Sequence, residues 1–214
     1  MISFFLGILL FQARVRAHCM LYNDSTMART KIALLIQGAD RRSIGRADEV
    51  VRLVQQQPRY FRELIECMWD ENAVVRMRAA DAAEKVSRAK PELLKPYKRE
   101  LLGLLAEAEQ IELRWHLAAM VPRLALTRAE KQRAAAALER YLEDRSSIVK
   151  TFALQGLADL ARSELGRRER VKQILEESLA SGTAAMKARA RKLLKELNSW
   201  GHPPDQIFIA DSLT

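Results

Sequence analysis

The sequence predicts an all-α protein built from stacked pairs of helices. With only 8 Gly and 6 Pro in 214 residues, the chain has too few turn residues for a β-sandwich or barrel. Hydrophobic residues make up 49% and charged residues 29%, which excludes a disordered chain and provides a core. One apolar pattern also recurs at offsets of 38, 36 and 37 residues, a period typical of helical repeat proteins.

Four segments carry this pattern, and each is predicted to form the second, or B, helix of a pair. In each segment apolar residues occupy positions i, i+4, i+8 and i+11, which lie on one face of an α-helix. The segments are Val75–Val86, Leu113–Leu124, Val149–Leu160 and Met186–Leu197.

A first, or A, helix is predicted before each B helix. These A helices are Arg59–Trp69, Leu93–Ala108, Arg128–Leu142 and Arg167–Leu179. Lys31–Gln37 and Ser43–Gln56 come earlier and are expected to form an N-terminal cap or a degenerate repeat. Because one pair cannot bury its apolar face alone, the pairs are expected to stack into one domain. The domain is predicted at residues 27–198, with the cap at 29–56 and repeats at about 58–88, 91–126, 128–163 and 166–197.

The N-terminal residues 1–26 differ from the rest. Ile2–Phe11 is an apolar run that is too short to span a membrane. It could be the apolar part of a signal peptide, but Arg14 and Arg16 follow it instead of preceding it, which is the wrong order for a leader. We therefore expect Met27 to begin the folded chain and residues 1–26 to be an extension outside the core.

Residues 199–214 are expected to form a loosely docked tail, because Pro203 and Pro204 stop a helix. The two cysteines, Cys19 and Cys67, cannot form a disulfide framework or a metal cluster. They favour a reducing, cytoplasmic location.

The turns before the B helices carry a second repeated feature. A basic residue follows the first apolar residue of every B helix, and in two repeats an Asp precedes it by six residues. This pattern resembles the HEAT-repeat signature over residues 58–197, and in that family these side chains form a polar ladder between repeats. The predicted ladder residues are Asp70, Arg76, Arg114, Asp144, Lys150 and Lys187. At Ala108 and Ser181, where the family has Asp, the ladder is expected to be broken.

The resemblance implies a right-handed α-solenoid of about four HEAT-like helical hairpins (an α-α superhelix) whose B helices line a concave surface. It also implies a binding or scaffolding role without naming a partner. We expect a non-enzymatic protein that presents this surface to a macromolecule, most plausibly another protein.

The residues that could carry chemistry do not form a recognisable site. HEAT-repeat hydroxylases of the deoxyhypusine type hold iron with His-Glu pairs, and none of His18, His116 and His202 belongs to such a pair. Nucleotide-binding, hydrolase and zinc-protease motifs are absent from the sequence. Cys67 is interpreted as a buried small hydrophobe. No catalytic residue, metal or cofactor is predicted.

Nucleic acid is the alternative partner. The net charge is +9, and basic residues outnumber acidic ones on the B helices, so a basic groove could collect phosphates. A less favoured alternative is an enzyme like the HEAT-like alkylpurine DNA glycosylases, for which Trp115, Asp81 and Asp159 would be available. Charge alone, however, indicates solubility and weak association more than a specific function.

A helical wheel predicts which residues face the concave surface. The candidate partner-binding residues on this surface are Met77, Asp81, Arg88, Trp115, Thr151, Arg162, Lys192 and Lys195. The wheel also places Glu84 on this surface. Trp115 has two interpretations: an exposed anchor for the partner, or a side chain that leans sideways to fill a gap between repeats.

Overall fold

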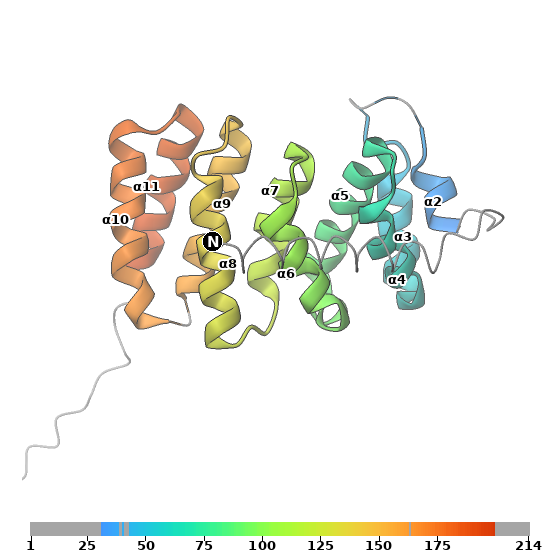
Figure 1. Ribbon diagram of the computed structural model, residues 1–214, viewed down its shortest axis with the longest axis horizontal. Helices are drawn as coiled ribbons and strands as arrows, with labels where there is room; N and C mark the ends of the chain where they lie inside the picture. The colour runs from blue at the N-terminus through green and yellow to red at the C-terminus, as the bar shows by residue number, and fades with distance from the viewer. Residues whose placement is uncertain (1–30, 39, 41–42, 163, 200–214) are drawn as a thin grey trace, which may run out of the picture.

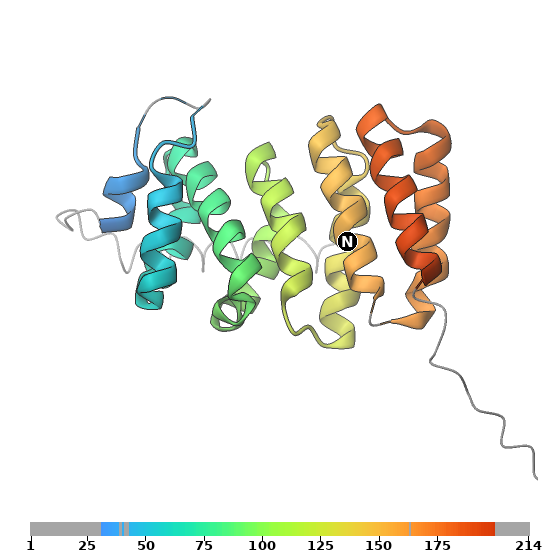
Figure 2. The same ribbon diagram turned by 180° about the vertical axis from the view of Figure 1, so that it is seen from behind.

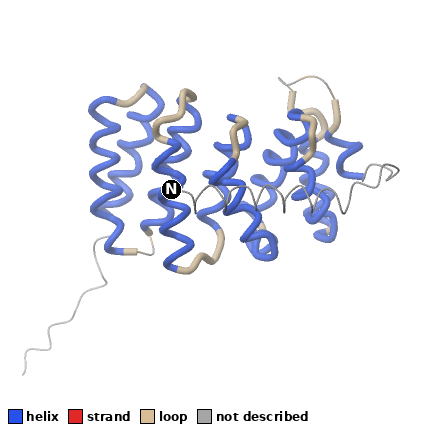
Figure 3. The backbone as a smooth tube through the Cα atoms, in the orientation of Figure 1, coloured by secondary structure: helices blue, strands red, loops and turns tan. Residues whose placement is uncertain are grey.

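The computed structural model describes residues 31–38, 40, 43–162 and 164–199, and these residues form helices joined by loops (Figure 3). No strand occurs among them, so the predicted all-α class is confirmed. Within the described part of the chain no helix is long and apolar enough to cross a membrane. The predictions for residues 1–26, and for the tail beyond Ser199, lie outside the described residues.

Two helices, α2 (Lys31–Ile36) and α3 (Ala47–Gln56), precede the pairs. The A helices are α4 (Phe61–Glu66), α6 (Lys98–Glu107), α8 (Arg128–Tyr141) and α10 (Leu165–Ser181). The B helices are α5 (Ala73–Ala89), α7 (Ile111–Met120), α9 (Ser147–Ala161) and α11 (Ala184–Ser199). Four 3-10 segments adjoin them: η1 (Pro58–Tyr60), η2 (Cys67–Trp69), η3 (Pro91–Tyr97) and η4 (Val121–Arg123).

The helices pack in chain order. Each B helix contacts the A helix of its own pair, and the helices α3, α5, α7, α9 and α11 each contact the next in that series. The molecule therefore extends from α2 at one end to α10 and α11 at the other (Figure 1). The view from behind shows the same order of helices (Figure 2).

The repeated apolar positions form the core between these helices. All four such residues of α5 are at most 1% exposed, and those of the second and third repeats are also buried. In α11, Leu194 is only partly buried, while its neighbour Leu193 is fully buried. Burial of one face in every B helix is what the spacing of these residues predicted.

The starts of several helices follow from local sequence. Asn72 caps α5 by accepting a 2.9 Å hydrogen bond from the backbone N–H of Val74. Thr127 and Glu130 form a reciprocal capping box at the start of α8. The predicted α-helix from Leu93 is wrong in its first turns, which are 3-10 in η3 and contain Pro96.

The segment before α3 also differs from the prediction. A helix was expected from Ser43, but α3 begins at Ala47. The backbone here is held by Arg78 of α5, which is 5% exposed and donates hydrogen bonds of 2.8 to 3.0 Å to four backbone carbonyls. These carbonyls belong to Ile36, Gln37, Asp40 and Ser43. A single buried guanidinium thus satisfies four backbone carbonyls at and after the end of α2.

Two glycines allow the chain to wrap closely around Arg78. Gly38 (φ 145°) and Gly45 (φ 53°) have left-handed backbone angles that other residues rarely adopt. A Cβ atom on either would also lie less than 3 Å from a guanidinium atom of Arg78. Side chains at these positions would therefore displace the cation that organises the segment.

Candidate functional site

The candidate site is the solvent side of the B helices, which we call the B-helix face. At its centre an aromatic pair joins two repeats: the rings of Trp115 on α7 and Phe152 on α9 are 5.1 Å apart between centroids. The guanidinium carbon of Arg189 on α11 lies 5.6 Å from the Phe152 ring. Arg189 is oriented by a 2.7 Å hydrogen bond from its Nη1 to Gln155 Oε1. We call Trp115, Phe152 and Arg189 the aromatic row.

The structure combines the two interpretations of Trp115. Its ring leans toward the next repeat and contacts Phe152, as the gap-filling interpretation expects. Both rings nevertheless remain only partly buried, so part of the pair is accessible on the B-helix face. Such half-buried aromatic side chains can bind a partner without a large conformational cost.

Most of the other predicted face residues do reach solvent. Met77 is half-buried, the Arg88 side chain is 63% exposed and the Lys192 side chain 72% exposed. Arg162 and Lys195 are exposed as well.

Thr151 corrects the prediction. It is only 8% exposed, and its hydroxyl donates a 2.7 Å hydrogen bond to the backbone carbonyl of Ser147. The helical wheel placed it outward, but the side chain is buried and its hydroxyl binds its own helix. Thr151 is therefore not available to a partner.

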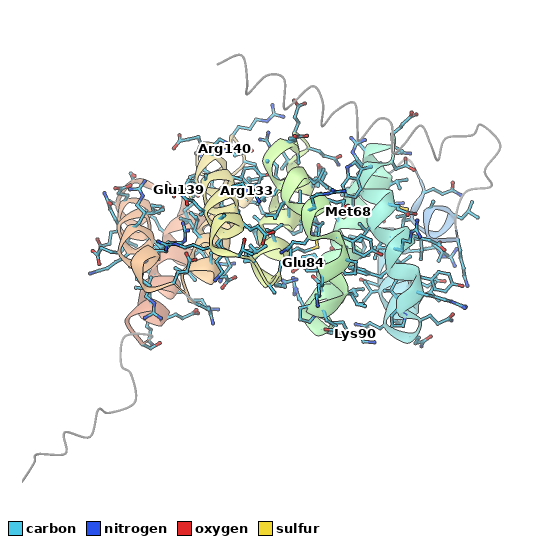
Figure 4. The ribbon with its side chains drawn as sticks, turned by 60° about the horizontal axis from the view of Figure 1, so that its bottom comes forward. Met68, Glu84, Lys90, Arg133, Glu139 and Arg140 are labelled. Atoms are coloured by element: carbon cyan, nitrogen blue, oxygen red, sulfur yellow. The ribbon has the colours of Figure 1, made fainter. Side chains whose placement is uncertain are left out.

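Glu84 is a second departure from the helical wheel. It was expected on the open side, yet Glu84 (labelled in Figure 4) is 2% exposed. It forms ion pairs with Arg88 (2.8 Å) and with Arg123 of η4 (2.5 Å). Arg123 also donates to the Glu84 carbonyl and to Ser87 Oγ. Burial alone would raise the pKa of Glu84, but the hydrogen bonds from the two arginines outweigh it and the pKa is lowered.

The acidic residues considered for a glycosylase-like enzyme are engaged within their own helices. Asp81 lies 2.9 Å from Lys85 Nζ, which also contacts Asp48 of α3. Asp159 accepts a 3.0 Å hydrogen bond from Gln155, and burial raises its pKa. Both carboxylates therefore have structural partners on the B-helix face.

Two of the predicted ladder arginines contact the next repeat. Arg114 on α7 forms an ion pair with Asp144, which precedes α9 and also accepts a 2.7 Å hydrogen bond from the backbone of Ser146. In the repeat before it, Arg76 donates to Gln110 Oε1 (2.8 Å). No Asp stands at Ala108, and the side-chain amide of Gln110 makes the contact between these two repeats instead.

Asp70 has a different role from the one the resemblance implies. Its backbone carbonyl, not its carboxylate, accepts a hydrogen bond from Arg76 (2.7 Å). The carboxylate instead accepts one from the backbone N–H of Asn72 (2.7 Å), which stabilises the turn before α5.

The ladder changes character between the third and fourth repeats. Lys150 and Lys187 occupy the basic positions, but no ion pair joins either to a described residue. The hydroxyls of Ser147 and Thr183, 2.7 Å apart, connect the two turns instead. The prediction that the acidic position is lost at Ser181 is consistent with this arrangement.

The basic residues of the B helices are mostly committed to contacts within the chain. Arg78 binds backbone carbonyls, Arg114 and Arg123 bind buried carboxylates, and Arg162 pairs with Asp159 and Glu196. Cations without an ion pair to a described residue gather on α11, toward one end of the face. The excess of basic residues in the sequence therefore overstates the positive charge at the centre of the face.

Within the part of the chain that the structure describes, the cysteine and the histidine that could carry chemistry are both buried. Cys67 is 6% exposed and His116 is 1% exposed. No group of three or more His, Cys, Asp or Glu side chains that could hold a metal occurs among the described residues. His116 Nδ1 has no hydrogen-bond partner in that part of the chain.

The pH dependence of stability should reveal His116. Burial lowers its pKa from 6.5 to about 3; nearby Glu84 raises it, and Lys85 and Arg88 lower it further. Because the unfolded chain binds a proton more readily, the stabilising contribution is present above pH 6.5 and is lost as the pH falls toward 3. Through this histidine, we expect the free energy of unfolding to fall by about 2–3 kcal/mol as the pH is lowered from about 6.5 to about 4.5. His116→Leu should flatten that part of the profile, measured by urea unfolding at both pH values. An unchanged slope in the variant would contradict the assignment.

The chain was compared with known proteins by sequence and by fold. No family model and no curated protein matches the sequence. Among solved structures, the crystal structure of an engineered protein is similar, with a TM-score of 0.56, 17% sequence identity, and 79% of each chain covered. At this identity the likeness concerns the fold alone, and it agrees with the helical arrangement described above.

Proposed function

We propose that this chain is a HEAT-like repeat protein, a right-handed α-solenoid whose B-helix face binds another protein. The sequence pattern, the packing of the B helices in chain order and the ladder contacts of Arg76 and Arg114 support this assignment. In such an architecture the successive B helices form one continuous surface, which suits a binding or scaffolding role better than catalysis.

The observation that carries the proposal is the aromatic row. Large aromatic and arginine side chains dominate the binding energy of protein interfaces, especially near their centres. Here a half-buried Trp115 and Phe152 lie together on the middle B helices, and Arg189 lies over the second ring. The surrounding charges are largely neutralised within the chain, so a partner need not neutralise them.

Removing the Trp115 side chain tests the proposal directly. We expect Trp115→Ala to weaken binding of the partner about 30-fold, which corresponds to about 2 kcal/mol. Because the ring is only partly buried, we expect the free energy of unfolding to fall by about 1–2 kcal/mol, less than for a fully buried aromatic side chain. Binding is measured by calorimetry with the purified partner, and stability by urea unfolding followed by circular dichroism.

Trp69→Ala is the matched control. Trp69 is also partly buried, but it lies in η2, next to the A helix of the first pair. The Trp69→Ala variant should lose about as much stability as Trp115→Ala and retain full affinity for the partner. Equal effects of the two variants on binding would show that Trp115 acts through the fold and is no anchor.

The partner itself is sought by affinity capture on the full chain from the source organism, with and without nuclease. Capture counts as support only when the purified candidate binds directly and the Trp115→Ala variant binds it more weakly. A candidate that is lost on nuclease treatment would favour the alternative function.

That alternative, nucleic-acid binding, rests on the exposed cations of α11, including Lys192 and Lys195. Phosphate binding releases counterions, so affinity would fall steeply with added salt. Contact with the aromatic row would resist salt. A salt titration of the purified complex therefore separates the two functions.

A further inference from the structure

The last B helix has an unusually one-sided charge. Five of the charged residues of α11 are basic and only Glu196 is acidic. Met186, Ala190, Leu193 and Leu197 form its buried face. The basic residues cover the rest of the helix surface, and they are Lys187, Arg189, Arg191, Lys192 and Lys195.

Several basic residues of the earlier B helices pair with carboxylates. Among the described residues, most of the α11 cations have no such partner. Glu196 pairs mainly with Arg162, the residue that follows α9, at 3.1 Å, and lies 3.9 Å from Lys192. No ion pair joins Arg191, Lys195 or Lys187 to a described residue. We call Arg191, Lys192 and Lys195, which are all exposed, the α11 cation patch.

The patch begins where the aromatic row ends. Arg189, the last member of the row, contacts Phe152 and Gln155 of α9. Lys192 follows it three residues later and therefore lies about one turn farther along the same helix. A segment bound across the row toward the C-terminal end of the molecule would therefore meet the patch.

We infer that the protein partner binds through an acidic segment: apolar residues contact Trp115 and Phe152, and carboxylates lie against the α11 cation patch. This inference rests on the proposed function and adds the chemistry of the partner. Charge complementarity of this kind raises the association rate and sets the direction in which a partner binds.

Protein is favoured over nucleic acid by the distribution of charge. A nucleic acid carries phosphates along its whole length and is bound best by a groove that is basic throughout. Here Lys85, Arg88 and Arg123 on the first half of the face are each neutralised by carboxylates. An apolar middle with cations at one end fits a polypeptide that carries its acidic residues on one side.

The experiment selects ligands from a displayed library of random peptides of about 16 residues, using the full-length protein, and compares three proteins. The first is the wild type. The second replaces Arg191, Lys192 and Lys195 by Gln. The third is a matched control in which Gln replaces Lys95, Arg99 and Arg133. These three side chains are also exposed but lie outside the B helices (Arg133 is labelled in Figure 4). Circular dichroism checks that each variant folds.

We expect the wild type and the control to enrich peptides that combine apolar residues with several Asp or Glu. The α11 variant should bind the selected acidic peptides about tenfold more weakly, or worse. If the α11 variant proves unfolded, the single substitution Lys195→Gln, at one exposed side chain, is used with a proportionally smaller expected loss.

Four outcomes would overturn the inference. If the selected peptides carry no excess acid, or bind the α11 variant as well as the wild type, the acidic partner is excluded. The proposed function would still stand in that case if Trp115→Ala weakens their binding. If a DNA duplex of about 20 base pairs binds more tightly than any peptide at about 150 mM salt, and the α11 variant loses it, the patch is a nucleic-acid site. If no peptide is enriched and no DNA binds, both the inference and the proposed function fail.

Discussion

Replacing Leu157 by Asp is expected to unfold at least the C-terminal half of the molecule. Leu157 is 1% exposed in the middle of α9, and α9 packs against α7, α8, α10 and α11. A carboxylate there has no room for water and must either remain charged without a partner or take up a proton. Either state costs several kcal/mol, which is a large part of the stability of a typical domain. Urea unfolding followed by circular dichroism should show loss of much of the helical signal before denaturant is added.

Ile148→Asp is the control on the same helix. Ile148 is 44% exposed in the first turn of α9, where a negative charge is favourable to the helix dipole. It should change stability by less than about 0.5 kcal/mol. Cooperative unfolding of Leu157→Asp near the wild-type midpoint would mean that the helix faces are assigned incorrectly.

The second large effect is expected from Arg78→Met. Methionine retains the aliphatic part of the side chain but removes every donor that reaches the carbonyls of Ile36, Gln37, Asp40 and Ser43. Hydrogen bonds to a charged group contribute about 1.5–3 kcal/mol each, although the carbonyls released on the surface can bind water instead. We therefore expect a net loss of about 3–4 kcal/mol, measured by urea unfolding.

Hydrogen exchange locates the effect of Arg78→Met. The amides of α2 and α3 should lose protection first, because the carbonyls of Ile36, Gln37 and Ser43 are no longer bound by Arg78 of α5. Arg99→Met is the control, since that side chain is 86% exposed and pairs only loosely with Glu100. A loss below about 1 kcal/mol for Arg78→Met, or a loss spread evenly along the chain, would contradict the role given to this arginine.

The helices and the buried face of each B helix could be predicted from the sequence. Apolar residues at Val75, Leu113 and Val149, and those that follow them, are buried as their spacing requires. This works because the spacing depends only on the geometry of the helix that carries the residues. The same argument explains the success at Leu157 and the small error at Leu194, whose place in the core is shared with Leu193.

The outward face was harder to predict, as Glu84 and Thr151 show. Both lie opposite or beside the apolar face of their own helix, yet both are buried. A helical wheel describes one helix and contains no neighbours. The burial of Glu84 depends on Arg123 in η4, which belongs to the next repeat. One signal was present in the sequence: Arg88 stands four residues after Glu84, the spacing of an ion pair on a helix.

The sequence by itself determined the all-helical class of the described residues, the approximate positions of their helices and which side of each B helix is buried. Only the tertiary structure decided what the charged residues do: Arg78 binds a backbone segment, Arg114 binds Asp144, and the α11 cation patch remains open to solvent. The physical reason is the difference in sequence separation between the contacts that form a helix and the contacts that its charged side chains make. Helix formation and its apolar face depend on residues three to four positions apart, whereas the partners of these arginines lie 30 to 42 residues away in the chain. Which charged side chain meets which partner depends on how neighbouring helices are aligned. Packing of the whole core sets that alignment.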